Sequence, residues 1–123
     1  MISFSVTGQP VPQGSMKVIN GHVIHTRGSA LAAWRSAIAL EARRAGAFPT
    51  RAPITLNMTF VVTKPRTVKR DNPTVPPDLD KLVRGALDAL TAIAYVDDAQ
   101  VIELTAKKIY GEYPGVSIDI YEH

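Results

Sequence analysis

The sequence contains no cysteine, which excludes disulfide bonds and thiolate metal sites and favours a reducing, cytoplasmic compartment. It has no apolar run near the roughly 20 residues that a membrane-spanning helix needs. Its N-terminal residues also lack the basic segment and apolar run of a secretory signal peptide. We therefore expect one domain over residues 1–123, a length sufficient to bury a hydrophobic core.

Acidic residues are nearly absent from the first part of the chain. Residues 1–70 contain ten Lys or Arg and one acid, a formal charge of +9, whereas residues 71–123 contain four Lys or Arg and ten acids, a formal charge of −6. A basic segment favours a polyanionic partner, because Lys and Arg neutralise phosphates and release counterions. Six of the eleven acids crowd into residues 71–98. A DNA-binding module gains nothing from this crowding, whereas a metal-dependent nuclease requires it.

Hydrophobic alternation and turn signals divide the chain into strands, helices and one long loop. Alternating apolar residues predict strands, an Asn-Gly pair predicts a hairpin turn, and apolar residues at helical spacing predict two helices. The predicted order is strand 2–6, hairpin 17–24, helix 29–45, strand 54–62, loop 63–77, helix 79–94, strand 101–110 and strand 116–121. Because this is not a regular strand–helix alternation, we expect an α+β fold with a single mixed, mostly antiparallel sheet and two helices.

The first predicted helix has one apolar face. Trp34, Ile38 and Ala42 lie on that face at helical spacing, Ser29 is suited to cap the N-terminus, and Gly46 ends the helix. We expect Trp34 in the hydrophobic core rather than as a stacking platform for bases.

Two acids lie at the start of the second predicted helix, where their side chains can point toward the same place. A proline pair holds the preceding chain extended, so Asp78 lies just before the helix and Asp80 in its first turn. Extended residues at i and i+2 point the same way, so both carboxylates can converge on one point. At about 100° per residue, Asp80, Arg84 and Asp88 share the polar side of the helix.

A second acidic pair, Asp97-Asp98, follows the helix and precedes the strand at 101–110. If that strand packs beside the helix start, Asp98 can return to Asp78 and Asp80. Three carboxylates about 5 Å apart repel one another by roughly 3 kcal/mol per pair at an effective dielectric near 20. Such a cluster requires a cation, and hard oxygen ligands favour Mg²⁺ or Mn²⁺. The metal can activate water for phosphodiester cleavage, with Arg84 steadying the charge on the phosphorane.

Three short motifs resemble the RusA family of Holliday-junction resolvases: Pro77-Asp78-Leu79-Asp80, Leu87-Asp88-Ala89-Leu90 and Asp97-Asp98-Ala99-Gln100-Val101. Gly8-Gln9-Pro10-Val11-Pro12, the hairpin and Trp34-Arg35 fit the phage or prophage branch of that family. The resemblance covers nearly the whole chain. It implies a homodimeric, magnesium-dependent crossover junction endodeoxyribonuclease that cuts four-way DNA junctions symmetrically in recombination and repair. By position, Asp78, Asp80 and Asp98 are the implied catalytic metal ligands.

The chain departs from the family pattern beside the aspartates. The family usually has Asn after the Asp-Leu-Asp run and Lys four residues after its second Asp, where this chain has Lys81 and Arg84. Arg keeps the charge but does not readily act as a proton donor. Three explanations stay open: Lys81 has taken over the role, the basic residue is purely electrostatic, or activity is lowered.

Simpler interpretations apply to several of these residues. Asp97 and Asp98 can be turn residues; we expect Asp98 to be a ligand and Asp97 to support the site or the turn. Asp88 is expected to be a helix-surface acid that pairs with Arg84 at i−4; the alternative is that it touches the site. His22 and His25 lack the further ligands that a zinc site needs.

The basic residues are expected to bind phosphate. The predicted DNA contacts are Lys17, Arg27, Arg35, Lys64, Arg66, Lys69 and Arg70. No nucleotide cofactor or membrane is expected. One rival hypothesis is a metal nuclease that acts on flaps or plain duplex, and another is a non-catalytic protein that binds branched DNA and keeps the fold.

Overall fold

The computed structural model describes residues 1–14, 16–19, 22–25 and 28–123, and its side chains in residues 1–14 and 28–123. The elements follow one another in an order that fits the expected one, with one added 3₁₀ helix, η1. They are β1 (Ile2–Thr7), β2 (Met16–Ile19), β3 (His22–His25), α1 (Gly28–Arg44), β4 (Ile54–Val62), α2 (Leu79–Leu90), η1 (Asp98–Gln100), β5 (Val101–Tyr110) and β6 (Gly115–Glu122).

Four of the strands form one open sheet in the order β1-β6-β4-β5. The pairs β1–β6 and β6–β4 are antiparallel, whereas β4 and β5 are parallel. The expected α+β fold, with a mixed sheet and two helices, is confirmed. The hairpin differs from the expectation of a single sheet, because β2 and β3 pair with each other in a separate two-stranded sheet. The predicted turn at Asn20-Gly21 lies outside the described residues.

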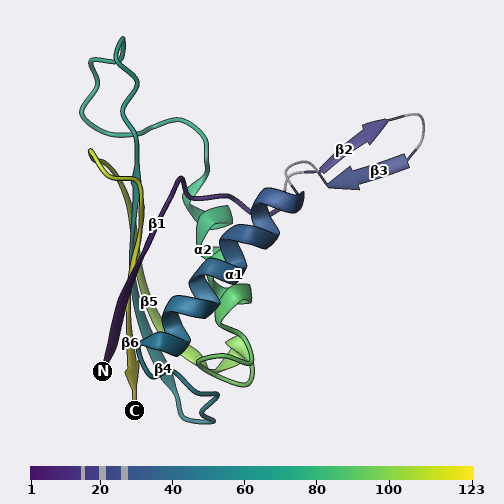
Figure 1. Cartoon of the computed structure of the whole chain (residues 1–123), viewed down its shortest axis with the longest axis vertical. Helices are drawn as coiled ribbons and strands as arrows, with labels where there is room; N and C mark the ends of the chain where they lie inside the picture. Colours follow the sequence, from purple (N-terminus) through teal and green to yellow (C-terminus); the bar gives the residue numbers. More distant parts are fainter. Residues whose placement is uncertain (15, 20–21, 26–27) are drawn as a thin grey trace.

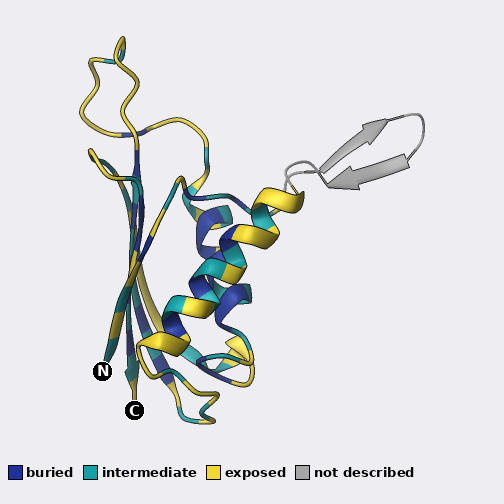
Figure 2. Cartoon of the chain, viewed as in Figure 1, coloured by how far each residue is buried: buried dark blue, intermediate teal, exposed yellow. Residues whose placement is uncertain are grey.

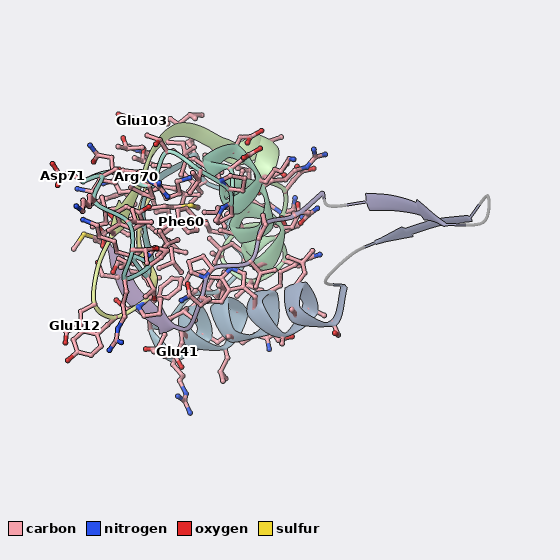
Figure 3. The ribbon with its side chains drawn as sticks, turned by 90° about the horizontal axis from the view of Figure 1, so that it is seen from above. Glu41, Phe60, Arg70, Asp71, Glu103 and Glu112 are labelled. Carbon is pink, nitrogen blue, oxygen red and sulfur yellow. The ribbon has the colours of Figure 1, made fainter. Side chains whose placement is uncertain are left out.

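Both helices lie against one face of the four-stranded sheet (Figure 1). The central strand β4 buries every second residue on that face, from Ile54 to Val62. Trp34 of α1 is 5% exposed and packs in this core, as predicted. Figure 2 colours buried residues on the sheet and on both helices, and Phe60 of β4, which is labelled in Figure 3, is one of them. The alternation of β4 and the apolar helix faces therefore build one core.

The helix ends differ from the sequence-based bounds. Helix α1 begins at Gly28, so Ser29 lies inside the helix and is not its N-cap. Helix α2 ends at Leu90 instead of Ala94, because Thr91 is extended and Ala92 has a φ of 66°. The Leu87 carbonyl accepts hydrogen bonds from the hydroxyls of Thr91 and Tyr95, at 3.0 and 2.7 Å. These side chains satisfy the last turn of the helix in place of a further main-chain turn.

The chain reverses direction between α2 and β5. The long loop 63–77 lies at one end of the molecule, α2 runs away from it, and residues 91–100 lie toward the other end (Figure 1). Because η1 leads directly into β5, this strand returns antiparallel to α2. Within the described part of the chain, no helix is long and apolar enough to cross a membrane.

Candidate metal and DNA site

Asp78 and Asp80 are exposed at the start of α2. Asp78 occupies the N-cap position in an extended conformation, yet its side chain makes no capping hydrogen bond. Its carboxylate instead lies 3.5 Å from the Lys81 ammonium. Asp80 lies in the first turn of the helix, where the macrodipole favours negative charge. Both carboxylates therefore face solvent as oxygen donors.

Asp97 shapes the turn before η1. Its side chain accepts a hydrogen bond of 2.9 Å from the Ala99 amide and forms a capping box with Gln100. The Gln100 side chain accepts from the Val96 and Asp97 amides and donates to the carbonyls of Thr50 and Ala52. Gln100 thereby anchors the turn, which also carries the exposed Asp98, to the chain before β4.

Asp98 lies near the C-terminal end of α2. Together with Asp88, Asp97, Thr91, Val96 and Arg35 it lines an open pocket of about 300 Å³. The eight-residue step from Asp80 to Asp88 corresponds to about 12 Å along a helix axis. Asp98 therefore lies at the opposite end of α2 from the first pair.

The expected convergence of Asp78, Asp80 and Asp98 within one chain is not found. Among the described residues, no group of three or more Asp, Glu or His side chains is placed to hold a metal ion. The expectation required the start of β5 to lie beside the start of α2. Because α2 and β5 run antiparallel, the end of β5 lies there instead, where the Lys108 Nζ donates to the Pro77 carbonyl at 2.7 Å.

The pKa of the buried Tyr95 phenol is affected by the negative charges at the C-terminal end of α2. Burial raises the pKa of this phenol well above the ordinary value, a hydrogen bond with Thr91 lowers it, and the negative charges of Asp98 and Asp88 raise it further. The phenol therefore stays neutral and donates to the Leu87 carbonyl. Asp88 and Asp98 both act on this one buried group, in agreement with their shared pocket.

Of the two basic residues beside the aspartates, Lys81 contacts one of them. It forms the ion pair with Asp78, whereas Arg84 is exposed one turn further along α2. The predicted pair between Arg84 and Asp88 is wrong: across the described side chains, no ion pair joins them. Asp88 instead faces the pocket that also holds Asp98 and Arg35.

The basic residues of loop 63–77 are exposed just before the acidic pair. They are Lys64, Arg66, Lys69 and Arg70, and Figure 2 shows most of this loop as exposed. The neighbouring Asp71 points outward in Figure 3. Arg35 lies at the other end of α2, in the pocket with Asp98. Arg27 and the side chain of Lys17 lie outside the described residues.

Sequence reasoning missed two residues of this region, Lys108 and Tyr110. The Lys108 Nζ donates hydrogen bonds of 2.7 Å to the carbonyls of Val75 and Pro77, and so fixes the chain that leads into Asp78. Arg70 donates from its Nε to the Tyr110 hydroxyl at 3.0 Å. Lys108 pairs in register with buried Phe60, so it lies on the sheet face that packs against the helices. A charged residue on that face of a strand was the signal that could have identified it.

Comparison with known proteins identifies the family of the chain. The family model described as Endodeoxyribonuclease RusA matches residues 7–121. A relative in Bacillus subtilis (strain 168), named Uncharacterized protein YqaN, is 33% identical over 138 residues, which cover 98% of this chain and 96% of that relative. The matched residues include the acidic pair at the start of α2, the Asp97-Asp98 turn and the basic loop. The chain belongs to the RusA family of endodeoxyribonucleases.

Proposed function

We propose that this protein is a magnesium-dependent endonuclease, with manganese as an alternative metal, that resolves four-way DNA junctions as a homodimer. One observation carries the proposal: a chain of the RusA family exposes Asp78 and Asp80 directly behind a basic loop. The loop supplies cations for phosphates, and the carboxylates supply oxygen ligands. Such an enzyme would act in DNA recombination and repair.

The donor set at Asp78 and Asp80 fits a hard cation. Magnesium characteristically binds one or two carboxylates and completes its shell with waters and substrate phosphate. Asp78 makes no capping hydrogen bond, and its exposed ion pair with Lys81 leaves oxygen lone pairs for a metal. Asp98 does not join this pair within one chain, because it lies at the far end of α2 with Asp88. A three-aspartate site therefore requires the Asp98 carboxylate of a second copy.

The edge of the sheet offers a surface for that second copy. β5 ends the strand order, so one of its main-chain edges has no strand partner in the four-stranded sheet. Ile102 is 66% exposed and Leu104 is 41% exposed on this strand. Leu104 pairs in register with buried Leu56, on the face that α2 covers incompletely. An isologous contact here buries this apolar surface.

A twofold axis near the middle of β5 and α2 exchanges the two ends of the helix. It would lay the Asp98 end of one copy beside the Asp78 and Asp80 end of the other. Two equivalent sites result, and their symmetry matches the two equivalent strands of a four-way junction. This proposal keeps all three predicted ligands and accounts for their separation in the single chain.

The bound metal would supply an activated water and stabilise the departing 3′-oxygen. The protein's own residues position the substrate. The loop cations Lys64, Arg66 and Lys69 neutralise phosphates on the approaching arm. The ion pair with Asp78 would place Lys81 beside a phosphate bound at the metal, where an ammonium can serve as a proton donor and a guanidinium cannot readily do so. We assign the family's lysine role to Lys81, with Arg84 as an electrostatic contributor.

Cleavage of a mobile four-way junction, compared with a linear duplex of the same sequence in Mg²⁺, tests the proposal. The wild type should cut two symmetry-related strands of the junction and leave the linear duplex intact. Equal cutting of the linear duplex would favour a nuclease of another specificity. Junction binding without cutting would favour the non-catalytic alternative. Asp80→Asn should abolish cutting and retain the gel shift of the junction, since it removes an oxygen ligand and leaves the basic loop unchanged.

A further inference from the structure

A pocket of about 240 Å³ lies beneath loop 63–77, beside the acidic pair. Its walls include four prolines of the loop, which are Pro65, Pro73, Pro76 and Pro77, and the side chains of Tyr110 and Arg70. We call it the proline pocket. Pro77 immediately precedes Asp78, so the pocket adjoins the start of α2. Phosphate binding by the basic loop and metal binding by the carboxylates do not require a pocket at this position.

The size of the proline pocket restricts its occupant. It far exceeds the about 15 Å³ that one water needs. It is also smaller than the roughly 300–1,000 Å³ of pockets that hold drug-sized ligands. A single planar ring system fits this range, whereas a folded peptide segment or a complete cofactor does not.

The chemistry of the walls suits a flat, neutral, partly polar ring. Proline has no N–H, so the loop prolines present apolar surface and few donors. Tyr110 adds an aromatic ring, and the Lys64 ammonium lies 5.8 Å from the centre of that ring. At the rim, the Gln9 amide donates to the Thr63 hydroxyl at 2.7 Å, which leaves the Gln9 carbonyl oxygen as an acceptor. Arg70 donates to the Tyr110 hydroxyl from its Nε, so the two terminal nitrogens of the guanidinium are available as donors to a ligand.

Three hydrogen bonds attach the pocket wall to β5. Lys108 binds the carbonyls of Val75 and Pro77, so this side of the pocket is attached to β5. Arg70 binds the Tyr110 hydroxyl from the other side of the loop. A preformed pocket loses less conformational freedom when a ligand enters it. Arg70, which lines the pocket, and Lys64, which lies beside the Tyr110 ring, are available to the phosphates that flank an inserted nucleotide.

We propose that the proline pocket takes one unpaired nucleobase at the branch point, next to the phosphate that is cut. This inference rests on the proposed function and adds a base-binding site to it. Bases at a branch have lost part of their stacking, so the cost of extruding one is lower than in continuous duplex. Stacking on an aromatic side chain then offsets the remaining cost. The pocket would thus select branched DNA by the availability of a base rather than by its sequence.

Base removal combined with pocket variants tests the inference. Four-way junctions of fixed sequence carry a single abasic nucleotide at each position flanking the branch in turn, and binding is measured without divalent metal. The wild type should bind the intact junction about five to one hundred times more tightly than the junction that is abasic at one of these positions. Tyr110→Ala and Thr63→Trp, which remove the ring and fill the pocket, should lose this preference. Tyr110→Phe should keep it.

Tyr113→Ala is the matched control, because Tyr113 is 78% exposed and does not line the pocket. It should behave like the wild type. The inference is overturned if Tyr110→Ala and Thr63→Trp both retain the wild-type preference, or if the wild type shows no preference at any position while still cutting junctions in Mg²⁺. A wild type that neither binds nor cuts any branched DNA overturns the proposed function, and the inference falls with it.

Discussion

Lys108 on β5 is bonded through its Nζ to the Pro77 main-chain oxygen, one residue before Asp78, at 2.7 Å. The bond joins the end of the edge strand to the entrance of α2. It also shows that the strand and the helix run in opposite directions. The position of the acidic pair relative to the sheet therefore depends on one half-buried lysine.

Replacing Lys108 with Met should destabilise the protein. The variant loses the Lys108 bonds to Val75 and Pro77; a hydrogen bond to a charged group contributes about 1.5–3 kcal/mol net, and less where water competes for the donor, as it does for this half-buried side chain. We expect a loss of about 1–3 kcal/mol in the free energy of unfolding, measured with urea. Lys107→Met, at the exposed neighbouring position, should stay within about 0.5 kcal/mol of the wild type. Equal effects at both positions would contradict the anchoring role.

Tyr95 should make stability depend on pH in alkaline solution. Its pKa is raised in the folded state above the ordinary value of 10.0. Below pH 10 both states hold the proton and this group adds no pH dependence; above it the unfolded state ionises first, so stability falls as pH rises. The free energy of unfolding should drop by up to about 1.4 kcal/mol per pH unit from this group.

The difference between wild type and Tyr95→Phe isolates that contribution, because the other titrating groups are common to both proteins. The variant should lose less stability than the wild type between pH 10 and 11. It should also be about 1 kcal/mol less stable at neutral pH, since it lacks the hydroxyl bond to Leu87. Parallel stability curves for the two proteins above pH 10 would refute the assignment.

The basic loop should appear in the salt dependence of junction binding. Removal of one phosphate contact lowers the slope of log K against log salt by about 0.9. Arg66→Gln should therefore reduce the magnitude of the slope by about one, measured by fluorescence anisotropy without divalent metal. Arg51→Gln removes an exposed charge outside the loop and should leave the slope unchanged. The same reduction in both variants would argue against a specific role for the loop.

Lys81 and Arg84 should have separable effects. Lys81→Ala should lower the rate of junction cleavage by about a hundredfold or more, as expected for loss of a proton donor, and leave junction binding within a few fold. Arg84→Ala should lower the rate by a smaller factor. Single-turnover cleavage with saturating enzyme measures both. A larger loss of rate for Arg84→Ala than for Lys81→Ala would show that Arg84, and not Lys81, has the role of the family's lysine.

Most of the fold could be predicted because its signals are local. Alternating apolar residues marked β4, and the Trp34, Ile38 and Ala42 spacing marked the buried face of α1. The separation of the hairpin from the main sheet had no local signal. The early end of α2 depends on the Tyr95 hydroxyl, which reaches back to the Leu87 carbonyl. Such contacts arise only after the chain has folded.

The sequence grouped Asp78 with Asp80 correctly, but it predicted the wrong position for Asp98 relative to them. Asp78 and Asp80 lie in one short segment, so backbone periodicity sufficed to group them. The position of Asp98 depends on the direction of β5 relative to α2, which is a tertiary property. The two hydrogen bonds of Lys108 determine which end of β5 lies beside Pro77: it is the end of the strand and not its start.

A mixing experiment with two inactive variants tests the shared metal site most directly. Asp80→Asn and Asp98→Asn should each bind four-way junctions without cutting them. If each site combines Asp78 and Asp80 of one copy with Asp98 of the other, a mixed dimer contains one intact site and one site with both changes. Equimolar mixing, with exchange of subunits, should therefore restore nicking of a single strand in Mg²⁺. Mixed dimers that form and bind the junction but leave all four strands intact would contradict the account.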